Sequence, residues 1–229
     1  MSGFCYALLW MLFYGIVRLS FRFKAVGQQH VPRRGGVLIA ANHASYLDIP
    51  FVACGVRRRL AYMGRQDLFA VPGLNWACRW LGWIPIRQGR VDRVGFGKAI
   101  QLIQSGRGVV IFPEGRRTTS GQLQPGMPGL GVIVEETRCP VIPAFIEGSF
   151  EVLPPGAWRI RFRPVRVRFG KPLHFSPEAL GVSGKEFYHV VSRTVMKEIA
   201  ALGGVEPPAE TVARVVRSRS KSGPSGVQS

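Results

Sequence analysis

Residues 36–48 read GVLIAANHASYLD, and residues 109–118 read VVIFPEGRRT. Each stretch is a short apolar run that is followed at once by polar and charged residues. Such a run is typical of a strand that is buried on both faces of a parallel sheet. Ligands of these sheets bind at the carboxyl ends of the strands, where the polar residues of both stretches fall. The two stretches therefore predict an α/β fold with a site at one edge of its sheet.

Short apolar segments alternate with helix patterns along the rest of the chain. We expect strands at 36–41, 60–63, 83–86, 109–112 and 141–146. We expect helices that start at Asp48, which is a candidate cap, and that cover 68–81, 91–105 and 131–137. The buried stripe of helix 91–105 is expected at Val94, Ala99, Leu102 and Ile103. This alternation indicates a mixed, largely parallel central sheet flanked by helices.

Residues 158–168 have a different pattern, in which arginine alternates with apolar residues on both sides of Pro164. A period of two predicts a strand, and the proline places it at an edge or a bulge. The arginine face either guards that edge against aggregation or meets anionic lipid or the phosphates of a cofactor. The sequence leaves both interpretations open.

The composition favours an anionic partner. The chain has 229 residues, enough for one domain with a sizeable core, and a formal net charge of +18. Membrane surfaces, nucleic acids and phosphorylated substrates all attract such a protein. The four cysteines, Cys5, Cys54, Cys78 and Cys139, are far apart and form no CxxC pattern, which favours free thiols in a reducing compartment over a zinc site.

The N-terminus is apolar and aromatic. Residues 3–17 carry no charge, and Arg18, Arg22 and Lys24 follow them. The run is shorter than the about 20 residues of a spanning helix, and it lacks the flanks of a signal peptide. We expect residues 3–23 to form a membrane-associated helix that lies in one leaflet, with its basic end among the headgroups. A single crossing and a helix packed on the protein's own core are the alternatives.

His43 and Asp48 suggest acid–base chemistry. A histidine accepts a proton near neutral pH, and a carboxylate five residues on can orient its other nitrogen. Since no Gly-x-Ser-x-Gly elbow accompanies them, direct attack by a bound hydroxyl fits better than a covalent intermediate. A purely structural hydrogen bond between the two is the alternative.

The second block suggests a phosphate site. The guanidinium groups of Arg116 and Arg117 match phosphate oxygens in pairs, and Gly115 permits a close approach of the backbone. Glu114 can orient an arginine or accept from a substrate hydroxyl. The alternative is a solvated loop with weak charge pairs.

The two blocks, about 70 residues apart, resemble those of the glycerophospholipid acyltransferase family, in particular 1-acyl-glycerol-3-phosphate acyltransferases. The resemblance covers residues 30–170. It implies that His43 is the general base and Asp48 its orienting partner. It assigns binding of the acceptor's phosphate to Glu114, Gly115 and Arg117, and the shape of the acyl-donor side to Pro143. Arg116 and Thr118, which adjoin Arg117, are further candidates for binding the substrate.

Three positions depart from the family's pattern. Gln88 stands where the family has an arginine that contacts phosphate, so Arg87 or Arg90 is our candidate substitute. Arg116 stands where threonine is frequent, and residues 123–126 lack the usual lysine. All three departures fall where the head group of the acceptor would be recognised.

The resemblance implies a membrane-bound O-acyltransferase at the cytoplasmic face of the inner membrane. It would transfer a fatty acyl group from acyl-CoA or acyl-carrier protein to 1-acyl-glycerol-3-phosphate, giving phosphatidic acid, without a metal, another cofactor or a nucleic acid. The expected organisation is a membrane-anchoring helix at 1–24, an acyltransferase domain at 25–205 and a disordered basic tail at 206–229. The alternatives are another lysolipid acceptor such as a lyso-ornithine lipid, a hydrolase, or a non-catalytic basic protein that binds membranes.

Overall fold

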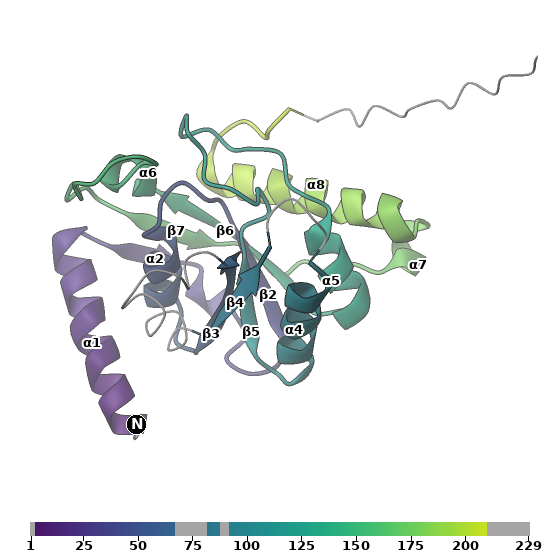
Figure 1. The fold of residues 1–229 in the computed structure, drawn as a ribbon, viewed down its shortest axis with the longest axis horizontal. Coiled ribbons are helices and arrows are strands. Elements are labelled where there is room, and N and C mark those ends of the chain that lie inside the picture. The colour runs from purple at the N-terminus through teal and green to yellow at the C-terminus, as the bar shows by residue number, and fades with distance from the viewer. Residues whose placement is uncertain (1–2, 67–81, 88–91, 210–229) are drawn as a thin grey trace, which may run out of the picture.

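The computed structural model describes residues 3–66, 82–87 and 92–209, with the backbone alone for residues 3–10. A seven-stranded sheet crosses the molecule in the order β1-β7-β6-β2-β5-β3-β4 (Figure 1). The strands are β1 (Lys24–Val26), β2 (Val37–Ala41), β3 (Leu60–Arg65), β4 (Trp83–Ile86), β5 (Gly108–Ile111), β6 (Val141–Glu147) and β7 (Arg166–Phe169). Five strands, from β6 to β4, run in one direction, while β7 is antiparallel to β6 and parallel to β1. The predicted mixed, largely parallel sheet is confirmed.

Helices cover both faces of this sheet (Figure 1). They are α1 (Gly3–Ser20), α2 (Asp48–Gly55), α4 (Arg93–Gln104), α5 (Gly129–Thr137), α6 (Ser149–Val152), α7 (Pro177–Leu180) and α8 (Gly184–Gly203), with a short 3-10 turn at Gln28–His30. Alternate residues of β2 enter two separate cores. Val37 and Ile39 pack with α1 and α2, and Leu38 and Ala40 pack with α4, α5 and α8. The whole of β2 is therefore buried, as its apolar sequence predicted.

The five predicted strands are all present, each within one or two residues of its expected bounds. The helix after β2 begins at Asp48, and the helix expected at 131–137 begins at Gly129. The helix expected at 68–81 lies outside the described residues, as do Gln88 and Arg90. The tail expected at 206–229 is described only as far as residue 209.

The predicted buried stripe of α4 was wrong at its start. Val94 is 83% exposed, and the buried positions are Gly95, Ala99 and Ile103. These residues are spaced by four along the helix, so they share one face. The side chain of Asp92 caps α4 by accepting hydrogen bonds from the N–H groups of Val94 and Gly95, so the helix begins just before the exposed Val94.

The strand predicted over residues 158–168 is correct only at its end. β7 begins at Arg166, and residues 153–165 form a loop after α6. Pro164 has no N–H to donate to a ladder, and β7 pairs with β1 and β6 only from Arg166 onward. Alternation persists within β7, where Val167 and Phe169 are buried and Arg166 is exposed.

The N-terminal helix is present, and its end joins the core. Val17, Phe21 and Phe23 are buried, and the rings of Phe21 and Phe23 lie 5.2 and 6.1 Å from the ring of Phe51 in α2. The last turn of α1 and the residues after it therefore pack on the protein's own core, which was one of the alternatives to a membrane-associated helix. Met11, Leu12, Phe13, Ile16 and Leu19 are exposed. Among the described residues, no helix is both long and apolar enough to cross a membrane.

Candidate active site

The carboxylate of Asp48 organises the turn that follows β2. Its Oδ2 atom accepts hydrogen bonds from Nδ1 of His43 at 2.9 Å and from the backbone N–H groups of Ala44 at 2.6 Å and Ser45 at 2.8 Å. Asp48 was predicted to cap α2, but its side chain makes no capping bond and faces back into this turn instead. The residue is fully buried, so this carboxylate is committed to the turn.

The contact with Asp48 sets the tautomer of His43. An ionised carboxylate only accepts hydrogen bonds, so Nδ1 of His43 carries the proton and Nε2 is the nitrogen with a free lone pair. The imidazole stacks on the ring of Phe112 at a centroid distance of 4.1 Å, and its side chain is 17% exposed. Nε2 is thus held in one orientation, as a general base requires.

Ser45 is not placed as a nucleophile. It is fully buried, and its hydroxyl oxygen accepts a hydrogen bond from the backbone N–H of Leu47 at 3.1 Å. The hydroxyl therefore serves the turn, which agrees with the absence of an elbow sequence around it.

The two sequence blocks are bonded to each other through His43. Its backbone N–H donates to Oε1 of Glu114 at 2.9 Å, and its carbonyl accepts from the N–H of Thr118 at 2.9 Å. β2 and β5 are adjacent and parallel, so their carboxyl ends bring the blocks to the same edge. The residues that follow β5, from Glu114 to Arg117, form a second turn, which we call the arginine turn. It consequently lies beside His43.

Glu114 is a buried tether between two loops. Its second oxygen, Oε2, accepts from the N–H of Gln124 at 3.2 Å. Burial raises the pKa of Glu114 to about 7, the two backbone hydrogen bonds oppose that rise, and the charge of Asp48 adds to it. Both described hydrogen bonds of Glu114 go to backbone N–H groups and none to an arginine, while its predicted bond to a substrate hydroxyl stays a prediction.

The arginines of the turn differ in their surroundings. The guanidinium of Arg117 lies over the ring of Tyr46, 3.5 Å from its centroid, so the first block holds the arginine of the second. Arg116 is exposed. Gly115 has φ +69°, a left-handed backbone conformation that favours glycine.

Two predicted residues lie away from this cluster. Arg87 follows β4, which is three strand spacings, or about 14 Å, from β2. Its side chain is exposed and its Nε donates to Gln66 at 3.4 Å. Pro143 pairs with Ala40 inside the sheet and lies against Gly170 on the α8 side. Their predicted binding roles stay predictions.

Sequence reasoning missed the partners that hold the turn in place. Asn42 spans to β6, where Nδ2 donates to the carbonyl of Ile146 at 3.1 Å and Oδ1 accepts from its N–H at 2.7 Å. Phe112 and Tyr46, which support His43 and Arg117, were quoted only as part of the blocks. An asparagine directly after a buried strand was the available signal, but the sequence offered none for its partner 104 residues away.

The described thiols take no part in this cluster. Cys54 and Cys139 are free and buried, and burial raises the pKa of Cys54 to about 12. No group of three or more His, Cys, Asp or Glu residues in the described part of the chain is arranged to hold a metal ion.

The fold and the cluster define a class of protein. It is an α/β protein with an oriented histidine, a buried serine that is not poised as a nucleophile and an arginine-bearing turn at one sheet edge. The family model described as Acyltransferase matches residues 22–147, more than half of the chain. The chain belongs to this acyltransferase family.

The chain is similar to several proteins that are named as acyltransferases. A chloroplastic 1-acyl-sn-glycerol-3-phosphate acyltransferase of Brassica napus is 29% identical over 141 residues, which are 59% of this chain and 40% of that protein. An enzyme of the same name from Bacillus subtilis is 24% identical over 69% of this chain and 77% of its own. A lyso-ornithine lipid O-acyltransferase of Pseudomonas aeruginosa is 32% identical over 49% of this chain and 42% of its own. The match thus spans about two fifths of the length of the Brassica relative.

A solved structure shares the fold. The crystal structure of PlsC, the 1-acyl-sn-glycerophosphate acyltransferase of Thermotoga maritima, has a TM-score of 0.66 with this chain. The two are 24% identical, and the likeness covers 88% of this chain and 84% of that one.

Proposed function

We propose that this protein transfers a fatty acyl group from a thioester to the free hydroxyl of 1-acyl-glycerol-3-phosphate, giving phosphatidic acid. The observation that carries this proposal is the pair of backbone hydrogen bonds that join His43 to Glu114 and Thr118. These bonds hold a base next to a turn with two arginines. One small acceptor can then place its phosphate on the turn and its hydroxyl at the histidine.

His43 acts as the general base in this reaction. Nε2 takes the hydroxyl proton while the hydroxyl oxygen attacks the carbonyl carbon of the thioester, whose π electrons move to the carbonyl oxygen. When the tetrahedral intermediate collapses, the C–S bond breaks and the thiolate leaves with the proton from the imidazolium. Asp48 stabilises that imidazolium through its bond to Nδ1. No acyl group is bound to the enzyme, because Ser45 is buried and already hydrogen-bonded.

Arg116 and Arg117 bind the acceptor's phosphate. The stack on Tyr46 fixes the plane of the Arg117 guanidinium and leaves N–H groups on its edge for phosphate oxygens. Arg116 adds a second charge from an exposed position. A dianionic head group is neutralised by two guanidiniums, which supports a phosphate monoester as the acceptor's head group.

A lyso-ornithine lipid is the second candidate acceptor. The Pseudomonas relative named for that substrate is the one among those described above with the highest identity, 32% over 114 residues. Its acceptor carries an amino-acid head group in place of a phosphate. The paired arginines of the turn support the phosphate-bearing acceptor over this alternative.

The donor is acyl-CoA or acyl-carrier protein, and the reaction takes place at the cytoplasmic face of the membrane. Both donors are anionic, which suits a chain of net charge +18. The exposed apolar residues of α1 suit a protein whose acceptor lies in a bilayer.

Thiol release from acyl-CoA, measured with a panel of acceptors, tests this proposal. We expect release to require an acceptor, to be fastest with 1-acyl-glycerol-3-phosphate and to give phosphatidic acid in equal amount. Faster thiol release with lyso-ornithine lipid would identify that lipid as the acceptor in place of 1-acyl-glycerol-3-phosphate. Release that needs no acceptor, with free fatty acid as the product, would show a hydrolase and overturn the proposal.

Arg117→Gln separates head-group binding from chemistry. We expect a rise of about tenfold or more in KM for the phosphate acceptor, since a charged hydrogen-bonding partner is lost, and a small change in kcat. Arg193→Gln on α8 is the matched control for the loss of one positive charge. An unchanged KM in Arg117→Gln would remove the phosphate role from this arginine.

A further inference from the structure

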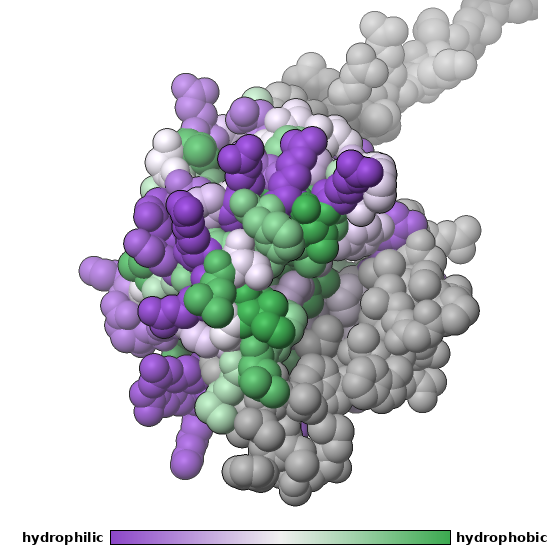
Figure 2. Space-filling view, turned by 90° about the vertical axis from the view of Figure 1, so that its left-hand side faces the viewer, coloured by the Kyte–Doolittle hydropathy of each residue, from purple (hydrophilic) through white to green (hydrophobic). Residues whose placement is uncertain are grey.

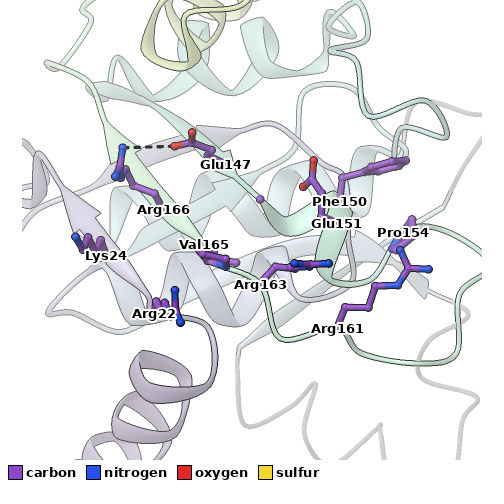
Figure 3. A pocket seen from close by; sticks show the side chains of 12 residues that line it. Arg22, Lys24, Glu147, Phe150, Glu151, Pro154, Arg161, Arg163, Val165 and Arg166 are labelled. Carbon is purple, nitrogen blue, oxygen red and sulfur yellow. Dashed lines mark ion pairs between the residues drawn. The ribbon is translucent and has the colours of Figure 1, made fainter.

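A basic cavity of about 920 Å³ opens at the same edge of the sheet, beyond the end of β6 (Figure 3). Five basic residues line it: Arg22, Lys24, Arg161, Arg163 and Arg166. They come from the end of α1, the start of β1, the loop 153–165 and the start of β7. None of His43, Asp48 and the residues of the arginine turn lines this cavity, so it is separate from the proposed active site.

Most of this positive charge is not neutralised. Glu147, on the far side of the cavity, is paired with Arg168 at 2.8 Å and with Arg166 at 3.8 Å. Glu151 is the other acidic residue of the lining. Within the described part of the chain, no ion pair joins Arg22, Lys24, Arg161 or Arg163 to a carboxylate. An anion with several oxygen atoms would satisfy these groups.

Arg22 is held in a conformation that favours glycine. Its φ is +44°, at the position that ends α1, where the N–H of Phe23 returns to the carbonyl of Arg18 at 3.2 Å. Both neighbours are buried, so the Arg22 side chain is directed outward, into the cavity. Arg138 is the other described residue, apart from glycines, with positive φ, and its guanidinium pairs with Glu178. Among the described residues, no carboxylate forms such an ion pair with Arg22. A ligand bound to Arg22 would explain why an arginine is kept in this strained conformation.

An exposed apolar loop borders the cavity. Trp158 is 80% exposed and Phe162 is 71% exposed, and the exposed Ile160 lies between them. Of the two arginines in this stretch, Arg159 stacks on Trp158 and Arg161 lines the cavity. Phe162 contacts Phe21 at the end of α1, with ring centroids 5.6 Å apart. The loop and α1 lie on one side of the molecule (Figure 1), and Figure 2 shows apolar residues on that side bordered by hydrophilic ones.

The arrangement matches a lipid–water boundary. Aromatic side chains with adjacent arginines favour the headgroup level of a bilayer, and the exposed apolar face of α1 favours the acyl chains below it. A soluble phosphate compound would fill the cavity but would leave Trp158 and Phe162 in water. The apolar border therefore favours a phosphate that belongs to a lipid.

We propose that this cavity binds the phosphate headgroup of an anionic phospholipid of the bilayer, while Trp158, Ile160 and Phe162 enter the lipid beside α1. The protein then has a second membrane contact in addition to its N-terminal helix. This contact fixes how the sheet edge, and with it His43, faces the membrane. The inference does not depend on the acyl-transfer reaction, because it concerns binding in the absence of substrates.

Vesicle co-sedimentation of the full chain tests the headgroup site. Arg161→Gln/Arg163→Gln should weaken binding to vesicles of phosphatidylcholine and phosphatidylglycerol by about 30-fold, from the loss of two charges at the surface. Binding to pure phosphatidylcholine vesicles should be unchanged. The matched control, Lys185→Gln/Lys197→Gln, removes two exposed charges from α8, which does not line the cavity, and should bind as the wild type does. Equal losses in the two double variants would reduce the effect to net charge and overturn the proposal.

Two further measurements identify the ligand. Trp158→Ser should weaken binding to neutral and anionic vesicles alike, because it removes apolar contact and no charge; this exposed position should leave the thermal unfolding midpoint unchanged. Inorganic phosphate and CoA, each at millimolar concentration and matched ionic strength, should not release the wild type from anionic vesicles. Release by CoA, together with a raised KM for acyl-CoA in Arg161→Gln/Arg163→Gln in neutral micelles, would assign the cavity to the donor's phosphates and refute the lipid site.

Discussion

Asp48 determines both the orientation and the tautomer of His43. One carboxylate oxygen accepts from the imidazole and from two backbone N–H groups of the turn. In Asp48→Asn the amide oxygen can keep all three of these hydrogen bonds, but the negative charge that stabilises the imidazolium is lost. We expect kcat to fall by about 10²- to 10⁴-fold with little change in KM. Unchanged kcat would make the pair purely structural.

Glu114 gives the fold a dependence on pH. Its pKa is raised from 4.5 to about 7, so the folded protein binds a proton between these pH values that the unfolded chain has lost. The free energy of unfolding therefore falls as pH rises from about 4.5 to 7, by up to about 3 kcal/mol from this group. In Glu114→Gln this fall should be absent. Urea unfolding of both proteins at pH 5 and pH 7.5 gives the change in the free energy of unfolding between the two pH values. An equal change in the wild type and in Glu114→Gln would contradict this role of Glu114.

Among single residues, those of the candidate site were easier to predict from the sequence than the residues that support them. His43, Asp48 and the arginine turn follow buried strands, so their meeting at one edge was predictable. The bonds of Asn42 to Ile146 and the stack of Arg117 on Tyr46 join segments far apart in the chain, which only the register of the sheet brings together. Arg87 was proposed from its place in a sequence motif. The motif does not indicate the order of the strands, so it could not predict that Arg87 follows a strand three positions away from β2.

The packing of α4 on β4 makes opposite predictions for two of its glycines. A side chain at Gly95 would overlap Ile86 and lie 2.9 Å from the carbonyl oxygen of Pro85, whereas Gly97 faces open space. We expect Gly95→Ala to destabilise the protein by about 1–3 kcal/mol. We expect Gly97→Ala to stabilise it by up to about 1 kcal/mol through helix propensity. Thermal unfolding of both variants provides the measurement, and a stabilised Gly95→Ala would show that α4 does not pack this closely.

At the scale of elements, strands were predictable where both faces are buried. Their sequences are nearly continuous apolar runs, such as β2 and β5. The alternation at 158–168 extended the prediction of β7 too far, because exposed arginines also alternate in a loop that no partner strand bonds. α8 was not predicted, although Phe187, Val191, Val195 and Ile199 recur every four residues on its buried face.

For the whole molecule, α1 both belongs to the core and extends from it. Removing residues 1–13 should leave a folded protein, since Val17, Phe21 and Phe23 remain, and should weaken binding to neutral vesicles by about tenfold or more through lost apolar contact. Removing residues 1–24 should instead unfold the protein, because it also deletes these core residues. Circular dichroism and vesicle sedimentation of the two truncations test this. A folded second truncation would place all of α1 outside the core.

The predicted anchor and the acyltransferase domain therefore meet inside one folded unit. The sheet gathers the histidine, the arginine turn and the basic cavity at its carboxyl edge, since β6, β2 and β5 all end there. This arrangement could be predicted as far as the edge, because parallel strands share it. The cavity could not, because it needs the return of β7 and the end of α1 to close around it.

Acyl transfer by His43→Ala tests the central claim most directly. With acyl-CoA and 1-acyl-glycerol-3-phosphate, and with His189→Ala on the exposed face of α8 as control, thiol release gives kcat/KM for each protein. We expect a loss of about 10³-fold or more in His43→Ala and none in His189→Ala. A folded His43→Ala variant that transfers acyl groups at the wild-type rate would contradict it.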